Sequence, residues 1–190
     1  MKVVLIQPRE LFGPPERQAE LLECWKLNTM AGFDHIITPA GRPTFTELFD
    51  LCDPEAINVI ANSDIYLDAA SVQRLAALNQ FQALALSRTN VDERYTPALH
   101  PHKDSQDVWA FMGRPNIQAP FRMGQPGCDN RLAYLIKQAG YIVSNPAKTI
   151  KAYHLHNCAY RSYLVDPTKA PRGANKLDTV PGPYAFIEIT

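Results

Sequence analysis

The sequence predicts a single-domain α/β fold, in which a mixed but mainly parallel sheet is flanked by helices. The first observation behind this prediction is that short apolar segments alternate with segments of helical periodicity along residues 2–87, a pattern typical of parallel α/β sheets. The second is the length of 190 residues, which suits one domain with a sizeable core. The carboxyl ends of parallel strands meet at one edge of a sheet, where ligands of such folds bind.

The expected strands are apolar runs that are bounded by turn-forming residues. They cover residues 2–7, 33–38, 57–61, 82–87, 108–112, 141–144 and 149–155, with a further strand at 184–189. The expected helices cover residues 16–30, 44–52, 71–79 and a segment from 128 or 129 to 139. Residues 90–105 are polar and residues 114–126 contain three prolines, so both segments are expected to be loops.

Capping residues set the expected ends of the helices. Gly32 follows the first helix at a position where helices often end with glycine. Thr44 and Glu47 have the spacing of a capping box, and Ser71 is a suitable first residue for the third helix. The apolar residues expected to form the buried face of the first helix are Ala19, Leu22, Trp25 (or Leu27) and Met30.

The composition is that of an ordinary globular protein, with 46% hydrophobic and 20% charged residues. No apolar run approaches the roughly 20 residues of a membrane span, and the apolar N-terminal run is too short for a signal peptide. The four cysteines are widely spaced and include no C-x-x-C pair, which favours reduced thiols. We therefore expect a cytoplasmic protein without a membrane span.

Charge is distributed unevenly although the formal net charge is zero. Residues 1–95 contain 8 Lys or Arg and 13 Asp or Glu, whereas residues 96–190 contain 11 and 6. The basic second half suits a phosphorylated or polyanionic partner. A solvated surface would produce the same pattern, so both interpretations stay open.

A polar tip, Asn62-Ser63-Asp64, directly follows the apolar strand expected at residues 57–61. This position is the carboxyl end of a strand, where ligands gather in open α/β sheets. Mg²⁺ and Mn²⁺ prefer carboxylate oxygen and often bridge to substrate phosphates. Asp64 is therefore a candidate ligand of a hard divalent cation, although an Asp or Ser here can also cap a turn.

A second candidate, Asp129, lies at the start of a predicted helix, after the Gly-Gln-Pro-Gly segment at residues 124–127. The helix dipole favours an acid at this position, so Asp129 can be a helix cap. Alternatively, its carboxylate points into a cleft and accepts a proton from a hydroxyl group.

The third candidate is a pair of histidines, His154 and His156, in a predicted strand. Residues i and i+2 of a strand face the same side, so the two imidazoles could supply a metal ligand and a phosphate contact. Imidazole suits Zn²⁺ as well as Mn²⁺, and histidine pairs also occur on strands as structural or surface residues.

Motifs of several large enzyme classes do not occur in the chain. It contains no G-x-x-x-x-G-K-[ST], G-x-G-x-x-G, H-E-x-x-H or G-x-S-x-G. Their absence weakens assignment as a P-loop NTPase, a dinucleotide-dependent oxidoreductase, a zincin or an α/β-hydrolase.

The order of the three candidates along the chain resembles that of the GT-A glycosyltransferases, which use nucleotide sugars. Asn62-Ser63-Asp64 is similar to the D-x-D motif of this class, with Asn62 in place of the first Asp and Asp64 at the metal-binding position. Residues 124–127 resemble its glycine-rich loop. The resemblance covers residues 1–158, the GT-A-like catalytic domain, and residues 159–190 would be a Pro/Gly-rich extension packed on the same domain.

The resemblance also implies roles for the other candidates. Asp129 matches the catalytic base of the class, although Cys128 precedes it where Glu is common. His154 or His156 matches the C-terminal metal-binding histidine. Residues implied in binding the donor are Gln7, Arg9, Arg42, Asn62, Arg88 and Asp107. Trp109 and Phe111 are expected in the core rather than against a sugar.

The function expected from this resemblance is metal-dependent transfer of a sugar from a nucleotide diphosphate sugar, most readily a UDP-sugar, to a hydroxyl group. The cofactor would be Mn²⁺ or Mg²⁺. A hydroxymethylated DNA base, flipped from the stack, would suit the basic second half and the short chain, and a saccharide acceptor is equally compatible. A sugar-phosphate nucleotidyltransferase and a non-catalytic nucleotide-sugar binding module are the alternatives.

Overall fold

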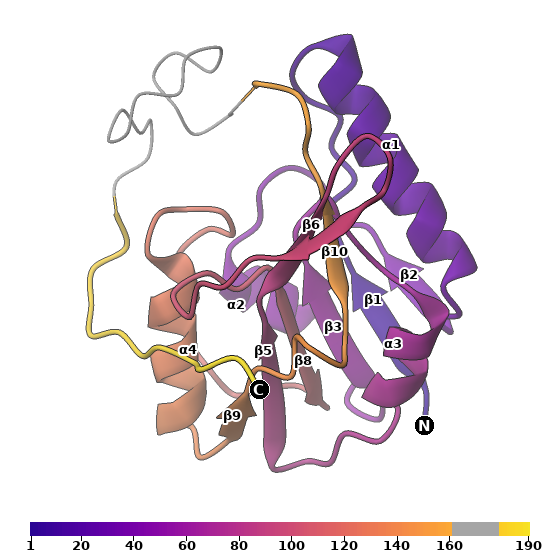
Figure 1. Cartoon of the computed structure of the whole chain (residues 1–190). Coiled ribbons are helices and arrows are strands. Elements are labelled where there is room, and N and C mark those ends of the chain that lie inside the picture. Colours follow the sequence, from indigo (N-terminus) through magenta and orange to yellow (C-terminus); the bar gives the residue numbers. More distant parts are fainter. Residues whose placement is uncertain (161–178) are drawn as a thin grey trace.

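A six-stranded sheet forms the centre of the computed structural model, which describes residues 1–160 and 179–190 (Figure 1). Its strands in spatial order are β2 (His35–Ile37), β1 (Val3–Ile6), β3 (Ile57–Ala61), β8 (Val108–Met112), β5 (Gln82–Leu86) and β9 (Ile142–Ser144). A second sheet contains, in order, β4 (Ile65–Leu67), β10 (Ala152–Leu155), β6 (Arg88–Val91) and β7 (Pro97–Leu99). The helices are α1 (Pro15–Met30), α2 (Phe45–Asp50), α3 (Ala69–Leu75) and α4 (Cys128–Gln138).

The direction of β8 makes the central sheet mixed. β1 is parallel to β2 and β3, and β5 is parallel to β9, but β8 is antiparallel to both β3 and β5. The chain leaves β5 at its carboxyl end and enters β8 at the same edge, where the Asp107 amide donates a hydrogen bond to Leu86 O. β8 must therefore run in the opposite direction. The predicted single-domain α/β class with a mixed sheet is confirmed, and five of the six described strands of the central sheet run in one direction, as expected.

Helices and the second sheet cover both faces of the central sheet. Val4 and Ile6 belong to a hydrophobic cluster shared with α2 and α4, whereas Val3 and Leu5 belong to a cluster shared with α3 and β4. Helix α1 packs against β4 and β10 (Figure 1). Burial on both faces explains why the central strands are apolar runs rather than alternating patterns.

Several elements confirm the sequence-based expectations. Trp109 and Phe111 of β8 are 2% and 1% exposed and lie in the core. Thr44 and Glu47 form the expected capping box of α2. Gly32 follows α1 with φ of +91°, a left-handed conformation that favours glycine.

The buried face of α1 differs from the expected one. Leu22 and Met30 are 39% and 63% exposed. Two of the residues on the buried face are polar, and hydrogen bonds compensate for their burial; the Asn28 side chain, for example, bonds to Gln7 and to the main chain of β4. A hydrophobic pattern cannot reveal such a face. The buried residues of α1 are Arg17, Leu21, Cys24 and Asn28.

Three other segments also differ from the expectation. β6 and β7 form an antiparallel pair that extends into the segment expected to be a loop, because β6 is too polar to give an apolar strand signal. Asp68, not Ser71, caps α3, and its side chain accepts a hydrogen bond from the Ser71 amide. Residues 184–189 do not form a strand, and their ladder contact is an isolated bridge between Asn145 and Ile189.

The described part of the C-terminal extension packs on the same domain. Val180 and Ile187 are buried, the Val180 amide donates to Pro126 O, and the Ala185 amide donates to Asn130 O. Residues 161–178 of the predicted extension lie outside the described residues. Four of the eleven basic residues of the second half fall in this range.

Two expectations about the chain's chemistry can be compared with the described residues. None of the described helices has both the length and the apolar character that crossing a membrane requires. The four cysteines are all described and none is in a disulfide, which agrees with the expected reduced thiols.

We expect the substitution Thr44→Ala to lower the free energy of unfolding by about 1 kcal/mol, because it removes the side chain that caps α2. Thr44→Ser keeps the capping hydroxyl and should stay close to the wild type. Urea unfolding of both variants tests this, and equal losses in the two would show that the cap is not the cause.

Candidate functional site

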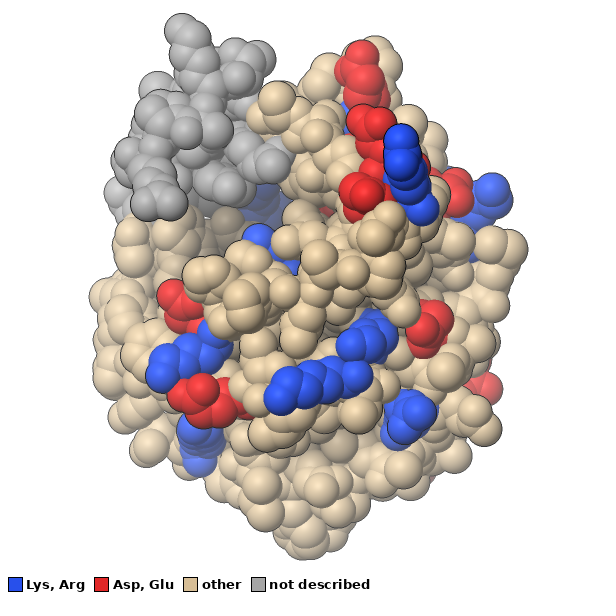
Figure 2. All heavy atoms as spheres, viewed as in Figure 1, with Lys and Arg blue, Asp and Glu red and all other residues tan. Residues whose placement is uncertain are grey.

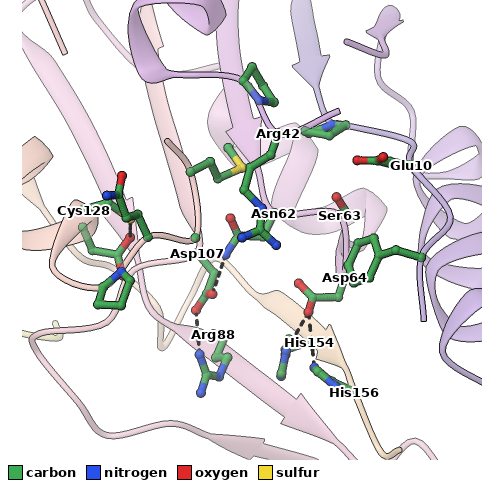
Figure 3. Close-up of a pocket in the computed structure, with 18 of the residues that line it drawn as sticks. Glu10, Arg42, Asn62, Ser63, Asp64, Arg88, Asp107, Cys128, His154 and His156 are labelled. Atoms are coloured by element: carbon green, nitrogen blue, oxygen red, sulfur yellow. Dashed lines mark hydrogen bonds and ion pairs between the residues drawn. The ribbon is translucent and has the colours of Figure 1, made fainter. Parts of the chain in front are cut away.

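A cavity of about 580 Å³ opens at the edge of the central sheet where β3 ends. Eight of the ten predicted site residues line it, and they come from segments that are far apart in the chain (Figure 3). The eight are Arg42, Asn62, Asp64, Arg88, Asp107, Asp129, His154 and His156. The predicted edge of the sheet therefore carries a pocket, while the chemical role of each residue stays a prediction.

Gln7 and Arg9 do not line the cavity, so the structure does not support their predicted contact with a nucleotide. Gln7 is 1% exposed and its amide is fully occupied: Nε2 donates to Asn62 O and Ile65 O, both at 2.7 Å, and Oε1 accepts from Asn28. The Arg9 guanidinium lies over the Trp25 ring, 3.7 Å from its centroid. Gln7 instead holds the main chain on both sides of Ser63 and Asp64.

Asp64 meets both predicted histidines inside the cavity. Asp64 Oδ2 lies 3.2 Å from His154 Nε2 and 3.5 Å from His156 Nδ1 (Figure 3). These contacts follow from pairing between β4 and β10, in which His154 lies opposite Ile65, the residue after Asp64. The Leu155 amide also donates to Asp64 O at 3.0 Å. Two segments about 90 residues apart in the sequence are thus fixed side by side.

The outer nitrogens of both imidazoles are engaged by hydrogen-bond acceptors. His154 Nδ1 lies 3.0 Å from Asn90 Oδ1, and that oxygen also accepts from Arg88 Nε. His156 Nε2 lies 2.7 Å from Tyr160 O. Since a carbonyl oxygen only accepts, each outer nitrogen carries the ring proton. The inner nitrogens, His154 Nε2 and His156 Nδ1, face the Asp64 carboxylate.

A divalent cation fits this donor set. The ligand atoms of Asp64, His154 and His156 lie within 4.8 Å of one another. Metal-binding histidines almost always donate their other N–H to an oxygen acceptor, as both of these do. Burial alone would raise the pKa of Asp64, but His154, His156 and Arg17 lower it well below the ordinary value. The carboxylate is therefore ionised, as a metal ligand must be.

Arg17 is a site residue that the sequence did not reveal. It is 2% exposed and lines the cavity, and it forms ion pairs with Asp64 and Glu20. Its Nη1 also donates to Leu155 O at 3.1 Å, between the two histidines. One feature of the sequence could have indicated its burial. Arg17 precedes Leu21 by one helical turn, so both lie on the buried face of α1.

A polar row lies beside the candidate cation ligands and consists of Asn62, Asp107 and Arg88. Asp107 Oδ1 accepts from Asn62 Nδ2 at 2.8 Å, and Oδ2 lies 3.3 Å from Arg88 Nη1 (Figure 3). Arg88 is linked through Asn90 to His154. One network of hydrogen bonds therefore joins the end of β3 to β6 and β10.

Asp129 lies in the first turn of α4, whose N-cap is Gly127 rather than Asp129. The Cys128 thiol donates to Asp129 Oδ1 at 3.3 Å. Burial and the nearby Asp107 carboxylate raise the pKa of Asp129 to about 8, although Cys128 and Arg88 act in the opposite direction. A carboxyl with a pKa near the working pH can both accept and release a proton.

The glycine-rich loop before Asp129 is held by the C-terminal segment. Gly127 has φ of +79°, and a Cβ there would lie 3.2 Å from atoms of Thr179, Val180 and Tyr184. The Val180 amide donates to Pro126 O at 2.8 Å. Residues 179–184 thus support the loop that places Asp129 in the cavity, although the resemblance to known enzymes did not extend to this segment.

Comparison with known proteins gives no family assignment: no family model matches the chain, and no curated protein matches it. The candidate site is therefore argued from its geometry and chemistry.

The raised pKa of Asp129 predicts a specific pH dependence of stability. In the unfolded chain an Asp has a pKa of about 3.9, so between that pH and about 8 the folded protein binds more protons at this position. Stability should therefore fall as pH rises through this range. Asp129→Asn removes this contribution, and in urea unfolding at pH 5 and pH 9 without metal the variant should lose less stability than the wild type. Asp104→Asn, an exposed control, should keep the wild-type slope, and an unchanged slope in Asp129→Asn would contradict the assignment.

Proposed function

We propose that this chain is a metal-dependent glycosyltransferase that moves a sugar from a nucleotide diphosphate sugar, most readily a UDP-sugar, to a hydroxyl acceptor. The observation that carries the proposal is the orientation of His154 and His156. Both direct their inner nitrogens at the ionised Asp64 and use their outer nitrogens to donate, in a cavity that also contains Asp129.

The cation ligands would be Asp64, His154 and His156, and the cation expected is Mn²⁺ or Mg²⁺. When bound, such a cation stabilises negative charge on a leaving nucleotide diphosphate. Asn62 and Arg88 hold Asp107 at the side of this position. Arg88 and Arg42 also line the cavity, where guanidinium groups can contact phosphate oxygens.

Asp129 would act on the acceptor. In an inverting reaction its carboxylate accepts the proton of the acceptor hydroxyl while the hydroxyl oxygen bonds to the anomeric carbon and the bond from that carbon to the nucleotide diphosphate breaks. Because the pKa of Asp129 is about 8, the fraction able to accept a proton rises with pH through the neutral range. In a retaining reaction the same group would position the acceptor.

The acceptor that we propose is a hydroxymethylated DNA base, and a saccharide is the competing acceptor. The charge asymmetry of the sequence supports the DNA acceptor. On the face shown in Figure 2, the described basic side chains are interspersed with acidic ones, as on a solvated surface. The test of the acceptor must therefore compare both classes directly.

The cation and donor sites can be tested together with Asp64→Ala. In the wild type, Mn²⁺ with a UDP-sugar at roughly 100 times its Kd should stabilise the fold by about 2.7 kcal/mol, because the ligand binds only the folded state. The stabilisation should disappear with EDTA and in Asp64→Ala, and remain in Asp104→Ala, whose carboxylate is 57% exposed and lies outside this cavity. Thermal unfolding measures it, and no shift with any nucleotide sugar would overturn the proposal.

The transfer step can be tested with Asp129→Asn. We expect this variant to keep the metal-dependent thermal shift and to lose transfer by about 10²- to 10⁴-fold, the usual contribution of a general base. Mass spectrometry of hydroxymethylated DNA and of a saccharide panel would detect a gain of one hexose. Full activity of Asp129→Asn would contradict its proposed role, and a gain on saccharides alone would exclude the DNA acceptor.

A further inference from the structure

A second group of metal-ligating side chains adjoins the cavity. Glu20 of α1, His156 and Cys158 bring a carboxylate oxygen, an imidazole nitrogen and a thiol sulfur within 4.8 Å of one another. The sequence pattern did not indicate Cys158 as a metal ligand, and Glu20 has no role in the proposed transfer. The two groups share His156.

The local structure fixes Glu20 and Cys158 together. Glu20 Oε1 accepts from the amides of Asn157 and Cys158, at 2.7 and 3.0 Å. The Cys158 thiol donates to Glu20 Oε2 at 3.4 Å, so its proton lies between sulfur and carboxylate. A cation that binds in this position replaces that proton, which is released to solvent.

We propose that Glu20, His156 and Cys158 form a second cation site, selective for a thiophilic divalent cation such as Zn²⁺. Thiolate is a soft ligand that Zn²⁺ accepts and that Mg²⁺ and Mn²⁺ bind poorly. The Asp64 group lacks sulfur, so the two groups differ in the cations they favour. The site does not depend on the glycosyltransferase proposal.

The structure also implies that the two cation sites exclude each other. Both groups draw on the one imidazole of His156, whose Nε2 is engaged by Tyr160 O and whose Nδ1 faces Asp64. Arg17 lies between the two groups and donates to both Asp64 and Glu20. Its positive charge opposes a cation on each side, and two cations at once would place three positive centres together. Zn²⁺ in the second site should therefore weaken Mn²⁺ binding in the first.

Co²⁺ is the probe for the second site, because Co²⁺ bound to thiolate gives a charge-transfer absorption band that Co²⁺ bound to oxygen and nitrogen lacks. The band should appear with the wild-type chain and with His154→Ala, which alters only the first group. The band should be lost in Cys158→Ser. Co²⁺ affinity should fall by roughly ten-fold or more, since the loss of even an indirect partner of a metal ligand lowers metal affinity by that factor.

Mutual exclusion is tested by Mn²⁺ binding with and without Zn²⁺. Zn²⁺ should weaken Mn²⁺ binding more in the wild type than in Cys158→Ser, and Glu20→Gln is the second variant if Cys158→Ser does not fold.

No Co²⁺ absorption band in the wild type, or a band that persists in Cys158→Ser, would overturn the second site. An equal effect of Zn²⁺ in both proteins would overturn the exclusion. None of these measurements uses a nucleotide sugar, so their failure is distinct from failure of the transferase proposal.

Discussion

The candidate site depends on the antiparallel pairing of β4 with β10. This pairing joins the segment that follows β3 to a strand about 90 residues further along the chain, and it places His154 opposite Ile65. The main-chain bond from Leu155 to Asp64 extends the contact by one residue. Because β10 also pairs with β6, the same strand brings Arg88 and Asn90 to the histidines. Without this strand the candidate cation ligands would belong to separate loops.

Buried polar groups hold this arrangement, and they would be costly if left unpaired. Arg17 is compensated by Asp64 and Glu20, and Gln7 by Asn28 and the main chain around Asp64. The partners of Arg17 come from α1, β10 and the segment before β4, and those of Gln7 come from α1 and from the main chain on both sides of Asp64. The polar network therefore specifies how α1 packs, and at the same time it fixes the Asp64 carboxylate.

The sequence carried information about the fold and the site to different extents. Apolar runs located the central strands, since those strands are buried on both faces, but they could not give the direction of β8, which depends on where its neighbours end. Asp64, His154 and His156, which the structure brings together in one cavity, could be picked out as candidates because strand position and residue chemistry coincide. Arg17 could not, because a charged residue in a helix ordinarily faces water. The buried contacts of Gln7 were not predicted for the related reason that its partners are distant in sequence.

Charge balance in the cavity gives a reason why anion binding there would need a cation. The arginines that line it are Arg17, Arg42 and Arg88, and the carboxyl groups are Glu10, Asp64, Asp107 and Asp129. With the pKa of Asp129 at about 8, that group is mostly neutral at pH 7, so three guanidinium groups face three carboxylates. A diphosphate would enter a cavity without net attraction. A divalent cation at Asp64 shifts the balance by two positive charges, in the part of the cavity where the carboxylates would otherwise repel phosphate.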